Sequence, residues 1–341
     1  MAKSSTANET DHTLAVDAQT PGEGITWISA RSLIALRSQA QSLPLDRNKI
    51  RARQGGAYLS SFKGRGMEFD ESRIYQPGDD IRNMDWRVTA RTGTAHTKIF
   101  QEERERPVLL WLDLSRSMMF ATRNCYKSVA AAKCVATIAW SAASNNDRVG
   151  ALIFSGEQHT EIKPGRGKSS ALKLIGQIER NEAWKDAGQQ AGQIDEQSRE
   201  KAIARLHSVT HPGSLLFMIS DFRGMSERAY SHLANLSRHN DVVLLRITDP
   251  FERDLPDVGL IRLSDGDAER QIDTHDEALR TEYHRHAADE SHELFRFCAR
   301  HRIHLVELST AEDVISRLQE TFSPVAGKRS HRSRRTGGIR R

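Results

Sequence analysis

Nearly continuous apolar runs constrain the fold of this chain more than any other feature. They alternate with segments of helical pattern and lie at 108–114, 148–154, 215–220, 242–247 and 303–308. A strand that is apolar on both faces is typical of a parallel sheet covered by helices on both sides. The segment 127–143, apolar almost all round, fits a helix packed on such a sheet. The alternation therefore predicts an α/β fold with a doubly wound, mostly parallel sheet.

The rest of the 341-residue chain divides into shorter parts. An Asp265-Gly266 pair flanked by apolar residues predicts a β-hairpin inserted near 260–274. The α/β domain follows an irregular, extended N-terminal segment. We expect a disordered lead at 1–24, an amphipathic helix at 25–46, a polar, glycine-rich segment at 47–106, the α/β domain at 107–322 and a basic, disordered tail at 323–341.

The sequence carries no targeting or disulfide signal. Its first residues lack the apolar core of a secretory signal. No stretch approaches the roughly 18 apolar residues that a membrane-spanning helix needs. The chain has 3 cysteines without CxxC spacing, which argues against a disulfide framework or a zinc finger. We therefore expect a cytoplasmic protein without a membrane span.

The net charge of +5 suggests at first a protein that binds nucleic acid. Seven basic residues and no acidic one lie at 328–341, which leaves a net charge of −2 for the rest of the chain. The tail alone is therefore a candidate for binding polyanions such as nucleic acid, or an acidic partner.

Polar residues end several of the predicted strands. Asp113, Ser115 and Ser117 follow the first run, Asp221 ends the third, and Asp249 follows the fourth. The carboxyl ends of parallel strands meet at one edge of a sheet, where ligands bind. Helix capping would explain one of the serines. Carboxylates and hydroxyls gathered at one edge are instead typical of a site for Mg²⁺ or another divalent cation.

The pattern Asp113-x-Ser115-x-Ser117 together with Asp221 resembles the metal-ion-dependent adhesion site of von Willebrand factor A domains. The resemblance implies that the two serines bind the metal directly and the aspartates largely through water. A carboxylate from a partner then completes the coordination. That family also supplies a threonine from the loop before the second helix. The corresponding loop here, 163–170, has none, so Ser169 or Ser170 would have to take its place.

A longer resemblance lies upstream of the predicted sheet. It consists of Gly64-Arg-Gly-Met-Glu-Phe69, Arg73-Ile-Tyr-Gln-Pro-Gly-Asp-Asp-Ile-Arg82, Asp85-Trp86 and Ala90-Arg91. This segment is similar to the hallmark of the bacterial domain-of-unknown-function 58 family, in which it directly precedes a von Willebrand A-like domain. The resemblance covers roughly 47–310 and implies association with MoxR-type AAA+ ATPases.

Within that segment, basic residues are interleaved with acidic ones. Mixed signs at this density predict a network of intramolecular ion pairs around Arg73, Arg82, Arg87 and Arg91. Trp86 is expected to pack against the α/β domain. If the segment faces a partner instead, the candidate contact residues are Arg82, Asp85 and Trp86, with Asp249 as a further candidate on the sheet edge.

Our leading hypothesis is a protein without enzymatic activity, an adaptor or co-chaperone of a MoxR-type AAA+ ATPase. It would bind partners through a metal site formed by Asp113, Ser115, Ser117 and Asp221. The first alternative is a metal-dependent hydrolase that uses the same cluster to activate water. The second is binding of polyanions through the C-terminal tail.

Overall fold

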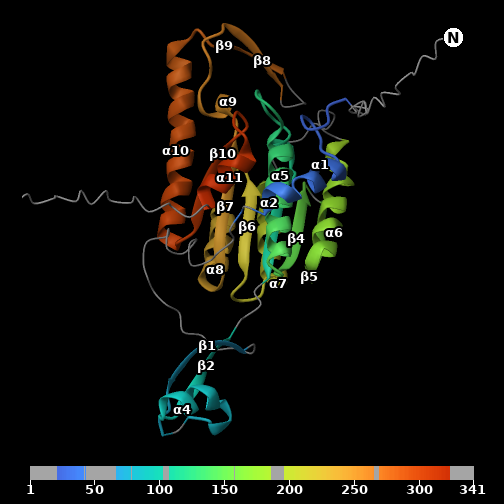
Figure 1. The fold of residues 1–341 in the computed structure, drawn as a ribbon. Coiled ribbons are helices and arrows are strands. Elements are labelled where there is room, and N and C mark those ends of the chain that lie inside the picture. The colour runs from blue at the N-terminus through green and yellow to red at the C-terminus, as the bar shows by residue number, and fades with distance from the viewer. Residues whose placement is uncertain are drawn as a thin grey trace, which may run out of the picture.

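Figure 1 shows a computed structural model of the chain. The structure describes residues 21–41, 43, 67–77, 79–102, 107–156, 158–185, 196–264 and 269–322. Most of the predicted lead at 1–24 and the whole basic tail at 323–341 lie outside the described residues.

The centre of the fold is a 6-stranded sheet in the order β10-β7-β6-β3-β4-β5. All neighbouring strands are parallel except β5, which runs antiparallel to β4. The predicted mixed α/β fold with a mostly parallel sheet is thus confirmed. The strands are β3 (Val108–Asp113), β4 (Arg148–Ser155), β5 (Gln158–Arg166), β6 (Leu215–Ser220), β7 (Asp241–Thr248) and β10 (His304–Ser309).

Helices cover both faces of this sheet (Figure 1). Leu110 and Leu112 of β3 point into one apolar core, while Leu109 and Trp111 point into the other. This division explains why the run is apolar at every position. The first face is covered by α1 (Ala30–Ala35), α2 (Arg37–Ala40), α5 (Lys127–Ser144), α6 (Gly167–Glu179) and α11 (Val314–Phe322), and the second by α7 (Glu196–Val209), α8 (Glu227–His239) and α10 (Glu277–His301).

The N-terminal helix is shorter than the predicted 25–46. The Ser29 side chain accepts a hydrogen bond from the Ser32 backbone N–H at 3.2 Å, which fixes the start of α1 at Ala30. Ile28 and Leu33 are buried in the first core, but Ile25 is exposed. The Trp140 indole of α5 donates to the Leu33 carbonyl, so this segment is attached to the central helix.

A separate small unit, residues 67–102, carries most of the motif that precedes the sheet. We call it the signature unit. It pairs β1 (Met67–Ile74) with β2 (His96–Glu102) in antiparallel fashion and contains η1 (Ile81–Asn83) and α4 (Trp86–Thr92). Figure 1 places it beyond the amino ends of the parallel strands. It therefore lies at the end of the molecule opposite the carboxyl edge of the sheet.

Shorter elements gather near the carboxyl edge. They are η2 (Arg116–Met118), α9 (Pro250–Arg253) and an antiparallel hairpin of β8 (Leu260–Ser264) and β9 (Glu269–Asp273). A further turn, η3 (Glu182–Trp184), follows α6. Within the described ranges, no helix combines the length and the hydropathy of a membrane span.

Candidate functional site

The order of the strands places the candidate site between β3 and β6. From β3 the chain moves to β4 and β5 on one side and then returns to β6 on the other. Leu112 pairs with Ile219 in this parallel register, so Asp113, the last residue of β3, and Asp221, the residue after β6, lie at neighbouring strand ends. In α/β proteins, ligands commonly bind at the carboxyl ends of the strands, where the strand order reverses in this way.

Asp113 is fully buried and both of its oxygens are engaged. Oδ1 accepts from the Ser115 backbone N–H at 2.8 Å, and Oδ2 accepts from Ser220 Oγ at 2.6 Å. Ser115 Oγ lies 3.3 Å from Ser117 Oγ. The residues that the sequence assigned to one site therefore share one edge of the sheet.

A guanidinium from α7 reaches into this group. Arg199 Nη2 lies 3.1 Å from Ser117 Oγ, 3.3 Å from Asp221 Oδ1 and 3.5 Å from Asp113 Oδ2. The side chain is 2 % exposed, and its Nη1 donates to the Arg223 carbonyl. Arg199 thus connects α7 to the ends of both β3 and β6.

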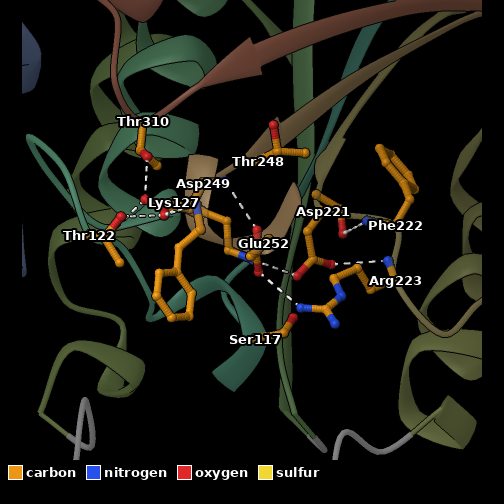
Figure 2. A network of polar contacts seen from close by, with 12 residues as sticks. Ser117, Thr122, Lys127, Asp221, Phe222, Arg223, Thr248, Asp249, Glu252 and Thr310 are labelled. Atoms are coloured by element: carbon orange, nitrogen blue, oxygen red, sulfur yellow. Dashed lines mark hydrogen bonds and ion pairs between the residues drawn. The ribbon is translucent and has the colours of Figure 1, made fainter. Parts of the chain in front are cut away.

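A second cation, Lys127 at the start of α5, occupies the other side of Asp221. Its Nζ lies 2.9 Å from Asp221 Oδ2 and 2.6 Å from Glu252 Oε1, and Glu252 also pairs with Arg223 at 3.1 Å (Figure 2). Burial alone would raise the pKa of Asp221, but Lys127 and Arg199 hold that pKa well below its usual range. The Asp221 carboxylate is therefore held in its ionised form.

Asp249 forms a neighbouring network rather than an open contact point. Its carboxylate accepts from the backbone and hydroxyl of Thr122, from Thr310 Oγ1 and from the Phe251 backbone (Figure 2). It also closes a capping box with Glu252 at the start of α9. Burial opposes ionisation, but the hydrogen bonds from Thr122 and Thr310 keep the pKa of Asp249 below its usual value. Asp249 is fully buried. A partner therefore has no access to this side chain, which the sequence suggested as a candidate contact residue.

The residues of this edge do not fit a divalent cation as they are arranged. Each carboxylate oxygen of Asp113 and Asp221 already faces a hydrogen-bond donor or a cation of the chain itself. Among the described residues of this edge, ion pairs join three carboxylates to three cationic side chains. The carboxylates are Asp113, Asp221 and Glu252, and the cations are Lys127, Arg199 and Arg223.

Ser169 and Ser170, which the sequence offered in place of the missing threonine, do not lie at the carboxyl edge of the parallel strands. Asp113 pairs with Phe154 at the carboxyl end of β4, whereas Arg166, just before Ser169 and Ser170, pairs with Arg148 at its amino end. These ends are six residues apart, about 20 Å along a strand. Because β5 runs antiparallel, α6 begins far from the cluster, and neither serine reaches it.

The signature unit differs from its prediction in the placement of Trp86. This side chain is 66 % exposed and does not pack on the α/β domain among the described residues. Ile74 and Ile81 of the same unit are also exposed. Asp85 is buried instead, since it caps α4 through the Arg87 and Val88 backbone N–H groups and accepts from Ser72 Oγ. Asp85 therefore holds the unit together from a buried position, where little of its side chain is open to a partner.

The predicted ion-pair network in this unit is limited. Arg73 pairs with Asp79 at 2.6 Å. Within the described part of the chain, Arg82, Arg87 and Arg91 are exposed and form no ion pair. The unit therefore presents arginines and large apolar side chains to solvent together.

Sequence reasoning missed both buried cations. Lys127 carried a signal, because it begins a segment that is otherwise almost entirely apolar and whose one other charged residue is Lys133. Arg199 carried none, because α7 also contains Glu196, Glu200 and Lys201 and has the pattern of a surface helix.

The family model described as "Protein of unknown function DUF58" matches residues 71–293. The chain belongs to the DUF58 family. The match begins inside the signature unit and ends in α10, so it includes the carboxyl-edge cluster.

The chain is also similar to individual proteins. "Uncharacterized protein Mb1516" of Mycobacterium bovis is 33% identical over 237 residues, which cover 68% of this chain and 71% of that protein. "Uncharacterized protein Rv1480" of Mycobacterium tuberculosis gives the same values. A solved structure, "conserved hypothetical protein BatB" from Bacteroides thetaiotaomicron, aligns with a TM-score of 0.40 at 15% identity, covering 63% of this chain and 96% of that one.

Proposed function

We propose that this DUF58 protein is a non-enzymatic interaction module, an adaptor of a MoxR-type AAA+ ATPase, and that its signature unit contacts the partner. The observation that carries this proposal is the exposure of Trp86, Ile74 and Ile81 on one small unit. The class of partner comes from the family resemblance. The fold we assign to the main domain is von Willebrand A-like.

The composition of the exposed surface supports a protein partner. Tryptophan and arginine are the residues most often enriched at the energetic centre of protein interfaces. Trp86 is the first residue of α4, and the exposed Arg82, Arg87 and Arg91 lie in or beside the same short helical elements. Without ion pairs among the described residues, these arginines favour an acidic surface on the ATPase.

The carboxyl edge supports a role without catalysis. A metal-dependent hydrolase needs an ion that activates a bound water. At this edge Lys127 and Arg199 already engage the carboxylates that would hold such an ion. The cluster therefore favours a structural part of an interaction domain over a hydrolytic centre.

The test measures binding of the purified ATPase to the full-length chain by fluorescence anisotropy. We expect Trp86→Ala to weaken binding at least about tenfold, as truncation of an interface tryptophan commonly does. The matched control is Phe295→Ala on α10, an aromatic residue of similar exposure (63 %) outside the signature unit. We expect this variant to bind like the wild type.

Two results would contradict the proposal. Equal affinity of the Trp86→Ala and wild-type proteins would remove the signature unit from the interface. Absence of binding by the wild type under any nucleotide condition would remove the ATPase as the partner.

A further inference from the structure

One nitrogen atom lies where most of the predicted metal ligands converge. Arg199 Nη2 is within 3.1–3.5 Å of oxygens from Ser117, Asp221 and Asp113. These are three of the four residues that the sequence pattern assigned to a divalent cation. The guanidinium thus takes up the oxygen lone pairs that the ion would need.

Lys127 completes this arrangement from the opposite side. Its ammonium engages Asp221 Oδ2 while Arg199 engages Oδ1, so both oxygens of the central carboxylate face a cation. Each cation is also anchored by a second contact, Lys127 to Glu252 and Arg199 to the Arg223 carbonyl. Because the exposed fractions of Lys127 and Arg199 are 0% and 2%, neither swings out without opening the core.

Charge balance leads to the same conclusion. The ion pairs described at this edge set three carboxylates against three cationic side chains, and the buried Asp249 adds a further carboxylate beside Glu252. A divalent ion among these side chains would place two more positive charges beside Lys127 and Arg199, which already pair with Asp221. Burying charge without a counter-charge is strongly unfavourable.

We propose that Arg199 and Lys127 replace the divalent ion, so that the carboxyl edge is assembled by the chain's own cations and needs no metal. The inference concerns the chemistry of this edge and does not depend on the adaptor function. A partner that binds at this edge therefore binds equally well after a chelator has removed divalent ions.

The first test is a titration of the full-length wild type with Mn²⁺, followed by electron paramagnetic resonance and by thermal unfolding in Mg²⁺ or EDTA. We expect no bound Mn²⁺ and the same melting temperature in both buffers. A bound ion at saturating concentration would raise the melting temperature by about 5 °C or more. Binding of Mn²⁺ that is lost in Asp113→Asn would overturn the proposal.

The second test removes the guanidinium. In Arg199→Ala, two carboxylates lose their shared cation, and we expect the variant to be less thermostable and to gain Mn²⁺ binding that partly restores its melting temperature. The matched control is Arg205→Ala on the same helix, since Arg205 is 48% exposed and lies 3.6 Å from Glu161 in a partly exposed ion pair. We expect that control to behave like the wild type.

The second test also has contrary outcomes. A folded Arg199→Ala protein that gains no affinity for Mn²⁺ would overturn the idea that Arg199 takes the ion's place. If Arg199→Ala does not fold, the wild-type titration decides the question alone.

Discussion

Lys127 and Asp221 form an ion pair with an Nζ–Oδ2 distance of 2.9 Å, and neither side chain is exposed to solvent. This pair joins the first turn of α5 to the end of β6, two segments that are far apart in the sequence. Removing one partner of such a pair leaves the other charge buried without compensation, which lowers the free energy of unfolding.

Replacing the cation of this pair should destabilise the fold strongly. Lys127→Met leaves Asp221 with one cation and removes a partner from Glu252. Breaking a buried pair from one side commonly costs about 3–5 kcal/mol in the free energy of unfolding. Urea denaturation followed by circular dichroism measures this change.

The control for that experiment is Lys168→Met, which alters an exposed lysine in the first turn of α6. Exposed substitutions of this kind usually change stability by no more than about 0.5 kcal/mol. Equal effects of the two variants would mean that the buried pair contributes nothing beyond an ordinary surface charge.

Stability should depend on pH through Asp249. Its pKa is lowered in the folded state, so its contribution is fully present above the usual aspartate pKa of about 3.9 and is lost as the pH falls through the folded value. At neutral pH we expect Asp249→Asn to be less stable by about 1–3 kcal/mol, because Thr122 and Thr310 lose a charged acceptor. Denaturation of both proteins across acid pH should show the difference shrinking below about pH 4. A difference that stays constant would show that the ionised form of Asp249 is not what the network stabilises.

Two tryptophans should respond in opposite ways to truncation. Trp111 in β3 is fully buried and stacks on Phe154 with ring centroids 6.1 Å apart, whereas Trp86 is 66% exposed. We expect Trp111→Ala to cost about 3–5 kcal/mol in unfolding free energy and Trp86→Ala about 0.5 kcal/mol or less. Thermal unfolding of the two variants checks this. A strongly destabilised Trp86→Ala protein would place that side chain in the interior of the fold.

The cysteines should resist alkylation while the protein is folded. Burial raises the pKa of Cys134 and of Cys298 to about 12, and it also raises the pKa of Cys125. Since the thiolate is the reactive form, we expect almost no modification by iodoacetamide at about pH 8 and full modification in denaturant. Mass spectrometry after timed quenching measures both rates. Rapid labelling of Cys134 in the native protein would show that α5 opens readily.

The main sheet was predictable because its strands are buried on both faces. Each of the apolar runs lies on a strand of the sheet, and the all-apolar segment after β3 forms α5. The antiparallel β5 was not predicted, since its outer positions are polar and Ile162 alone is buried. An edge strand of this kind lacks the continuous apolar pattern that identified the others.

The candidate site was predictable only in its anionic half. Strand ends that meet at one sheet edge place Asp113 and Asp221 together on topological grounds alone. The counter-charges come from two helices on opposite faces of the sheet, and no local spacing links Lys127 or Arg199 to those aspartates. Trp86 illustrates the same difficulty, because the residue type alone does not show whether a tryptophan side chain is exposed or packed in the core.

The attachment of the signature unit has a mechanical consequence. Only residues 103–107 separate the end of β2 from the start of β3, and β3 is held by β4 on one side and β6 on the other. A pulling force on the unit that is transmitted through this connection enters the molecule along its central strand. The force loads the hydrogen bonds of β3 with β4 and with β6 in shear. The resistance of the domain to being pulled apart is then set by its rate of unfolding under force rather than by its equilibrium stability.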